Sequence, residues 1–216
     1  MTTLLVEPHP LLDLAAFVSI YSSSLSTQMS PEKITAGFAV EAAETWCSSD
    51  EVRTSIRGLL RQSGFKPTGR NKPASEYLVK AATNGKLHSI NLAVDACNVV
   101  SLQSGLPISV VDTRHLTQPL TVGVASEKSE YVFNPSGQVL CLAGLLCLHD
   151  ANGPCANAIK DAQRTKTDAR TCSTLSLIWG TRSLPQRTSQ TTSLYRSLLE
   201  DAGVKTEAVT IVYDRP

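Results

Sequence analysis

The fold class is indicated most clearly by Ile90–Leu116, INLAVDACNVVSLQSGLPISVVDTRHL. Its first half predicts a buried amphipathic helix that stops at Gly105, because apolar residues recur at helical spacing and glycine commonly ends a helix. After the Gly-Leu-Pro break, a β-branched run predicts a short strand that ends at Asp112. Asp95 and Asn98 are three residues apart and share one helical face, where buried polar groups need partners. This face is therefore either a structural network or the floor of a site.

On either side of this stretch, the sequence pattern predicts mainly helices in the N-terminal part of the chain and mostly strands in the C-terminal part. Ser30 and Ser49 or Asp50 are suited to cap helices, and residues 65–72 read as a basic loop. From Ile108 the apolar period changes to two, which favours strands. These patterns predict an α+β protein, with N-terminal helices packed on a mixed, largely antiparallel sheet. The expected helices are 10–25, 31 to about 47, 50–64, 75–84, 90–105 and 187–202, and the expected strands are 109–112, 120–125, 131–133, 138–150, 173–180 and 207–214.

The composition is that of an ordinary globular chain. The 216 residues carry a net charge of +1, which argues against a protein that binds long nucleic acid through a large overall positive charge. A local basic patch that meets one end of an RNA remains compatible with this balance. The sequence shows no basic-then-apolar leader and no apolar run long enough for a membrane span, so we expect a cytoplasmic protein with no membrane contact.

The cysteines and histidines give no sign of a metal or a catalytic nucleophile. Six cysteines are scattered without a CxxC pair, and no histidine lies at zinc-ligand spacing. A reduced set of cysteines in apolar surroundings is expected, with no cofactor and no metal. The sequence also lacks the nucleophile elbow of serine esterases.

Three segments, in this order and spacing, resemble the B3/B4 domain: NKPASEYLVKAA (71–82), INLAVDACNVVSLQSGLPISVVD (90–112) and KDAQRTKTDART (160–171). This domain is the editing module of the phenylalanyl-tRNA synthetase beta subunit and also occurs as free-standing proteins of about this length. The resemblance implies a single editing domain over residues 1–216, with 1–64 as an N-terminal helical part and 65–180 as the recognisable core.

The resemblance also implies an activity, namely hydrolysis of the ester between a wrong amino acid and the terminal adenosine of a tRNA. The partner would be the 3′ aminoacylated end of a mischarged tRNA. One similar free-standing group removes canavanine, an arginine mimic, from arginine tRNA. The family uses positioned water and no covalent nucleophile, which agrees with the absence of a catalytic triad.

Carrying the family's site over residue by residue gives two matches and three departures. Asn98 matches the family's Thr-Asn pair, while Cys97 replaces the threonine. Ser109 stands where the synthetase has a histidine, Asp112 is kept, and Lys166 falls where a glutamate reads the tyrosine hydroxyl. The implied catalytic residues are Asn98 and Ser109, the substrate-binding residues are Asp95, Cys97, Asp112, Asp161 and Lys166, and the tRNA-binding residues are Arg70, Lys72, Arg164 and Thr165.

Several of these residues also have a structural interpretation. Asp95 can anchor the helix to a loop, Asp112 can cap backbone amides at the end of its strand, and Asp161 can pair with Arg164 on the surface. A basic run such as the one at 66–72 is commonly a solvated face.

Canavanyl-tRNA(Arg) is the leading substrate because the histidine and glutamate of the tyrosine site are both replaced. The alternatives are a tyrosyl-tRNA(Phe) deacylase, a non-catalytic module that binds tRNA ends or a free amino acid, and an esterase for small molecules.

Overall fold

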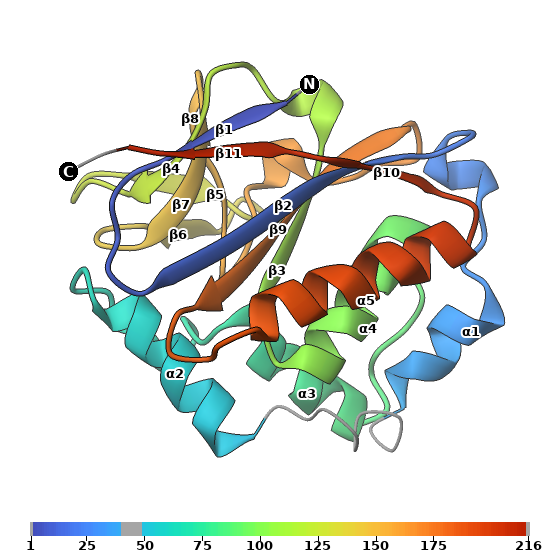
Figure 1. Cartoon of the computed structure of the whole chain (residues 1–216), viewed down its shortest axis with the longest axis horizontal. Coiled ribbons are helices and arrows are strands. Elements are labelled where there is room, and N and C mark those ends of the chain that lie inside the picture. The colour runs from blue at the N-terminus through green and yellow to red at the C-terminus, as the bar shows by residue number, and fades with distance from the viewer. Residues whose placement is uncertain (1, 40–48, 215–216) are drawn as a thin grey trace.

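Two long strands form the centre of the molecule. In the computed structural model, which describes residues 2–39 and 49–214, β2 (Leu12–Ile20) pairs antiparallel with β9 (Ser173–Thr181) along its whole length. Strands β10 (Lys205–Ala208) and β3 (Ile108–Asp112) flank this pair, in the order β10-β2-β9-β3 (Figure 1). Strand β3 therefore lies at the edge of an antiparallel sheet.

The helix predicted for residues 10–25 is wrong, because this segment contains β2. Its spacing of apolar residues fits a helix, yet the segment lies between β10 and β9 in the sheet. Both faces of a central strand are covered, and buried residues on both faces blur the period of two. Since β1 (Thr3–Val6) is also a strand, residues 1–64 are not the helical part that was expected.

A second sheet has the order β11-β1-β4-β7-β8. Strand β1 runs parallel to both β11 (Thr210–Tyr213) and β4 (Leu120–Val124), while the other pairs are antiparallel. Strands β7 (Leu146–Asp150) and β8 (Gly153–Asn157) complete this mixed sheet. The predicted last strand, 207–214, is divided between β10 and β11, which belong to different sheets.

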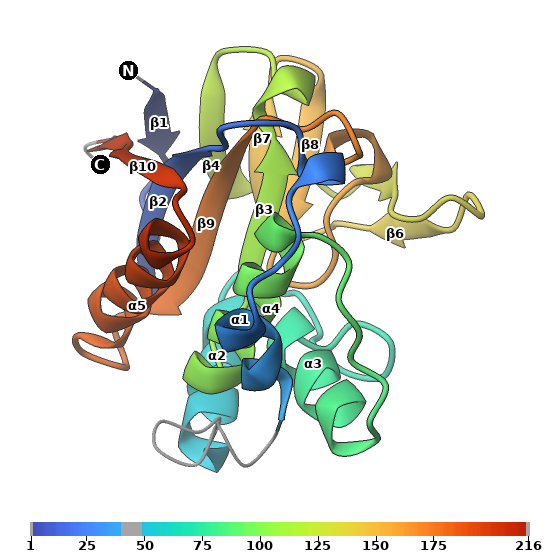
Figure 2. The ribbon, with the colours of Figure 1, turned by 90° about the vertical axis from the view of Figure 1, so that its right-hand side faces the viewer.

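Strands β5 (Glu130–Val132) and β6 (Val139–Cys141) form a separate hairpin. Figure 2 shows it projecting from the body of the molecule on the side where α3 (Ala74–Thr83) lies.

The remaining helices largely follow the prediction. Helix α2 (Asp50–Arg61) begins after Ser49, whose hydroxyl accepts the Val52 N–H at 3.3 Å. Helix α4 (Leu92–Ser104) ends at Gly105, which adopts the left-handed conformation that glycine favours. Helix α5 (Arg187–Asp201) also lies where it was expected. Of the helix predicted from residue 31 to about 47, the described part contains only α1 (Glu32–Thr35) and a short 3-10 turn, and residues 40–48 lie outside the described residues.

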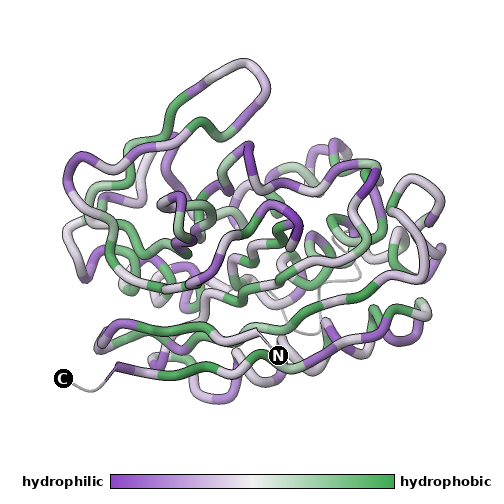
Figure 3. Tube along the Cα trace, turned by 90° about the horizontal axis from the view of Figure 1, so that it is seen from above, coloured by the Kyte–Doolittle hydropathy of each residue, from purple (hydrophilic) through white to green (hydrophobic). Residues whose placement is uncertain are grey.

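Helices α4 and α5 cover one face of the antiparallel sheet, and the second sheet lies toward its other face (Figures 1 and 2). Hydrophobic stretches follow the interior strands, whereas hydrophilic stretches fall mainly on loops at the periphery (Figure 3). The α+β class is confirmed. No helix within residues 2–39 and 49–214 combines the length and the apolar composition needed to cross a membrane.

Candidate functional site

A cavity of about 330 Å³ lies beside the free edge of β3, where α4 and the segment after β8 approach each other. Its walls are mainly apolar, and a small number of polar side chains face into it. This combination is typical of small-ligand sites. The lining residues are Ala74, Ile90, Val94, Cys97, Asn98, Ile108, Val110, Asp161, Lys166 and Thr167.

Asn98 presents an amide to this cavity from the middle of α4. It is half-buried, and its side chain makes no hydrogen bond within residues 2–39 and 49–214. A polar group in this position normally has a partner. The unpartnered Asn98 amide is therefore available to donate to a ligand and to accept from one.

Asp161 supplies the carboxylate of the cavity. Its Oδ1 accepts the Ser109 hydroxyl at 2.7 Å and the Asn157 N–H at 3.2 Å. Burial raises the pKa of Asp161 to about 6, although these hydrogen bonds and the positive charge of Lys166 act in the opposite direction. The carboxylate is therefore charged at neutral pH and becomes neutral in mildly acidic solution.

Ser109 supports Asp161 and does not line the cavity. It is fully buried, and its Oγ accepts the Trp179 indole N–H at 2.9 Å. Its hydroxyl donates to Asp161 Oδ1 at 2.7 Å, and the Asn157 carbonyl oxygen lies 3.2 Å from the same Oγ. This arrangement favours a positioning role for Ser109 over the catalytic role implied by the resemblance.

Lys166, Cys97 and Thr167 complete the polar lining. Lys166 Nζ donates to the Phe133 carbonyl at 2.6 Å, and burial lowers the pKa of Lys166 while Asp161 partly opposes this effect. Burial raises the pKa of the Cys97 thiol, and the charge of Asp161 adds to this. The Cys97 thiol donates to the Ile108 carbonyl at 3.7 Å, so it is protonated, held and unsuited to act as a nucleophile.

Asp95 lies outside this cavity. It is fully buried, and its Oδ1 accepts the Ile90 N–H at 2.8 Å. Its Oδ2 accepts the hydroxyls of Ser30, at 2.5 Å, and of Ser89. These contacts fit the anchoring role, and the structure gives Asp95 no access to the cavity.

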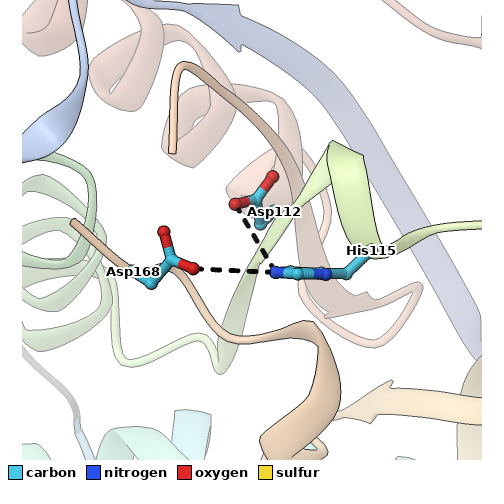
Figure 4. A group of neighbouring side chains, drawn as sticks. All are labelled: Asp112, His115 and Asp168. Carbon is cyan, nitrogen blue, oxygen red and sulfur yellow. Dashed lines mark ion pairs between the residues drawn. The ribbon is translucent and has the colours of Figure 1, made fainter. Parts of the chain in front are cut away.

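Asp112 belongs to a separate cluster at the end of β3. Its Oδ2 accepts Arg114 Nη2 at 2.6 Å and the Thr171 hydroxyl at 2.6 Å, and its side chain is fully buried. Arg114 also reaches Asp168 at 2.8 Å, and His115 Nε2 lies 3.9–4.0 Å from both carboxylates (Figure 4).

Asp112, His115 and Asp168 are close enough to ligate a metal ion, and no other group of this kind lies within the described residues. However, the Arg114 guanidinium already pairs with both carboxylates, and Arg170 Nη2 lies 3.7 Å from Asp168 Oδ2. This donor set therefore fits an ion-pair network better than a metal site, and Asp112 is not among the residues that line the cavity.

The four residues expected to meet tRNA do not form one surface. Arg70 lines a second cavity, and Lys72 is half-buried and makes no side-chain hydrogen bond or ion pair within residues 2–39 and 49–214. Arg164 binds Asp150 with two hydrogen bonds, at 3.0 and 2.7 Å, and so does not pair with Asp161. Thr165 is fully buried and donates to the Cys155 carbonyl at 3.0 Å.

Replacing Arg164 with methionine is expected to destabilise the protein. Burial alone would raise the pKa of Asp150, but hydrogen bonds from Arg164 and from two backbone N–H groups hold this pKa below its ordinary value. Arg164→Met leaves a buried carboxylate without its ion partner and should lower the free energy of unfolding by about 2–4 kcal/mol at pH 7.

Urea denaturation at two pH values would test this prediction. The stability that Arg164 provides is present above the unfolded pKa of Asp150 and is lost as the pH falls through the lowered folded value, so the difference between the proteins should shrink in strong acid. A stability equal to that of the wild type at pH 7 would contradict the structural role.

Asn157, which stabilises the turn that contains Asp161, was not predicted from the sequence. The Asn157 Oδ1 accepts the N–H groups of Ile159 and Lys160 at 2.8 and 3.0 Å, and its amide also contacts the Tyr131 hydroxyl. An asparagine that bonds the backbone two residues on is a recognised turn signal, so the pattern ANAIKD contains a clue. The long-range bond from Tyr131 to the Lys160 carbonyl has no such signal.

The fold and the cavity together define an α+β domain with a side pocket suited to a small polar ligand. The protein-family model of the B3/4 domain matches residues 65–179, which are more than half of the sequence. The chain therefore belongs to the B3/4 domain family, which confirms the resemblance.

Among solved structures, the chain is similar to an N-terminal fragment of the phenylalanyl-tRNA synthetase beta-subunit from Pyrococcus horikoshii. The TM-score is 0.54 at 10% sequence identity, and the match covers 99% of this chain and 52% of the fragment. The chain thus spans about half the length of that fragment, and at this identity the likeness shows a shared fold alone. A search of curated proteins finds no match.

Proposed function

We propose that this protein is a trans-acting aminoacyl-tRNA deacylase that hydrolyses the ester of a mischarged tRNA. Canavanyl-tRNA(Arg) is the leading substrate. The observation that carries the proposal is the cavity beside β3, in which Asn98, Asp161 and Lys166 face an apolar space. Its presence in a member of the B3/4 domain family, with the fold of a phenylalanyl-tRNA synthetase fragment, supports this choice.

The proposed reaction needs no covalent intermediate. Water attacks the carbonyl carbon of the ester, the bond to the ribose oxygen breaks, and the released ribose oxygen takes the proton that the water loses. An aminoacyl ester is labile, so orientation of the reactants supplies much of the required acceleration. The free Asn98 amide binds the ester carbonyl, where a donor stabilises the developing negative charge.

Asp161 binds the cationic end of the amino acid in this proposal. It is the carboxylate that faces the cavity among the three aspartates considered from the sequence. Canavanine carries an oxygen in place of a methylene of arginine, which makes its terminal group a weaker base with an additional acceptor. Lys166 lines the same space, where its Nζ can donate to the canavanine oxygen, an acceptor that arginine lacks.

Two alternatives remain as outcomes of the test. In a tyrosyl-tRNA(Phe) deacylase, Lys166 would contact the phenol. In a non-catalytic module, the same cavity would hold a tRNA end or an amino acid without turnover. The replacement of the family's histidine by Ser109 is compatible with this alternative.

A panel of charged tRNAs tests the proposal. The purified protein would be incubated in excess over arginine tRNA carrying canavanine or arginine, and over phenylalanine tRNA carrying tyrosine or phenylalanine. We expect release of canavanine well above the spontaneous rate and no acceleration with arginine. Binding without release from any of the four would favour the non-catalytic module.

Asn98→Ala is expected to lower kcat/KM for the released amino acid by about 10- to 100-fold, which corresponds to the loss of one or two hydrogen bonds to the reacting ester. The free energy of unfolding should stay within a few tenths of a kcal/mol or rise slightly, because the amide has no partner to lose and alanine favours a helix. Deacylation rates and urea denaturation would be measured together. Gln103→Ala, on the same helix but outside the cavity, is the matched control and should leave both unchanged. If the two variants behave alike, Asn98 has no part in the reaction.

A further inference from the structure

A second cavity, of about 350 Å³, lies against the β5–β6 hairpin. It is formed by the hairpin, the loop before α3 and the turn after β8, three segments that are distant in the sequence. Its lining combines two cations, two amides and an apolar wall, and contains no carboxylate. The lining residues are Arg70, Asn71, Phe133, Gln138, Val139, Leu140 and Lys160.

The cations of this region are held close together. Lys160 Nζ lies 4.3 Å from the centre of the Phe133 ring and donates to the Arg70 carbonyl at 3.3 Å. Within residues 2–39 and 49–214, neither Arg70 nor Lys160 forms an ion pair. Burial lowers the pKa of Lys160, and the nearby charges of Arg70 and Lys166 lower it further. Adjacent like charges of this kind favour an anionic ligand.

The two cavities are neighbours. Lys160 lines the second and Asp161, the next residue, lines the first. Phe133 connects them as well, because its ring lies under Lys160 and its carbonyl accepts Lys166 Nζ. The bonds from Asn157 Oδ1 to the N–H groups of Ile159 and Lys160 fix the turn between them. The two cavities therefore share this turn.

We propose that the second cavity binds the nucleotide that precedes the aminoacylated adenosine of the tRNA. Lys160 and Arg70 bind the phosphodiester that joins the two nucleotides, the Asn71 amide meets the base edge, and Leu140 forms the apolar wall under the base. This inference rests on the proposed function, since it takes the first cavity as the seat of the terminal aminoacyl ester. Charge complementarity selects the ligand, because a sugar–phosphate linkage is anionic and its base is planar and polar at the edge.

Binding of short RNA ends to the full-length protein tests this subsite. The probes are adenosine, CpA, CpCpA and inorganic phosphate, measured by calorimetry at fixed salt. We expect CpA to bind at least about tenfold more tightly than adenosine, and CpCpA to add little more. Equal affinities for adenosine and CpA would overturn the proposal. Phosphate binding as tight as that of CpA would reduce the site to a general anion site and would also overturn it.

Substitutions at Lys160 separate this contact from the fold. Lys160→Met should remove most of the gain from adenosine to CpA, whereas Lys160→Arg, which keeps the charge, should retain it. Lys80→Met, on the exposed side of α3, is the matched control and should behave as the wild type. Retention of the full gain by Lys160→Met would contradict the proposal, provided that its thermal denaturation matches that of Lys160→Arg.

The outcomes also separate this inference from the proposed function. If no charged tRNA is hydrolysed but the tighter binding of CpA relative to adenosine depends on Lys160, the subsite is supported and the proposed deacylase activity is rejected. If canavanyl-tRNA is hydrolysed and canavanyl-adenosine and canavanyl-CpA react with equal kcat/KM, the deacylase stands and the subsite fails.

Discussion

Asp161→Asn is expected to lower kcat/KM by about 100-fold or more while making the folded protein more stable at pH 7.5. The loss of activity follows because a charged carboxylate that holds a desolvated cation contributes about 2–5 kcal/mol to binding. Asparagine keeps an oxygen that can accept from Ser109 and from the Asn157 N–H, so the local geometry should persist.

The gain in stability follows from the raised pKa of Asp161. A carboxyl whose folded pKa lies at about 6 stabilises the fold in its protonated form below the unfolded value near 3.8, and this contribution is lost as the pH rises through about 6. Removing the charge should therefore raise the free energy of unfolding by about 1–3 kcal/mol above pH 7. The difference from the wild type should vanish below pH 4.

Deacylation rates from pH 5 to 8 and urea denaturation at pH 4 and 7.5 would check both effects. In the wild type, activity should rise with pH through about 6 as Asp161 acquires its charge. An Asn variant that is fully active, or a wild-type rate that is flat across this range, would show that the carboxylate does not hold the substrate.

Asp112→Asn is expected to have the reverse pattern, with a large loss of stability and almost unchanged kinetics. Hydrogen bonds from Arg114 and Thr171 hold the pKa of Asp112 below its ordinary value against the opposing effect of burial. Without the charge, Arg114 loses its closest carboxylate partner, and we expect the free energy of unfolding to fall by about 2–4 kcal/mol at pH 7. In the wild type this contribution is present at neutral pH and is lost on acidification.

Asp168→Asn is the matched control, because Asp168 binds the same guanidinium but is partly exposed. Asp168→Asn should lower the free energy of unfolding by about 1 kcal/mol or less. Both variants should keep kcat and KM within about twofold of the wild type, since neither residue lines the cavity. A tenfold rise in KM for Asp112→Asn without loss of stability would restore Asp112 as a substrate ligand.

Local signals in the sequence were sufficient for most helices and for the family. Gly105 ends α4 and Ser49 caps α2, as expected, and Asn98 lines a cavity. These features depend on residues close together in the chain, where capping and periodicity act.

Features that depend on distant partners could not be predicted. Residues 12–20 form a strand because β9 and β10 lie on either side, and no local pattern encodes those neighbours. Likewise, Arg164 turns toward Asp150 and Trp179 toward Ser109 because of where the chain folds back. The polar residues of the sequence motifs were thus identified, but their division between the cavity and the supporting structure required the three-dimensional arrangement.

The most direct test of the central claim is an NMR titration with a non-hydrolysable analogue, in which canavanine is joined to 3′-amino-3′-deoxyadenosine through an amide. If the cavity beside β3 seats the aminoacyl group, the largest backbone amide shifts will occur at Cys97, Asn98, Asp161 and Lys166, and Asp161→Asn will abolish them at the same concentration. Shifts confined to another surface, such as the groove of α5 lined by Thr192 and Arg196, would contradict the claim, as would the absence of any shift at millimolar analogue.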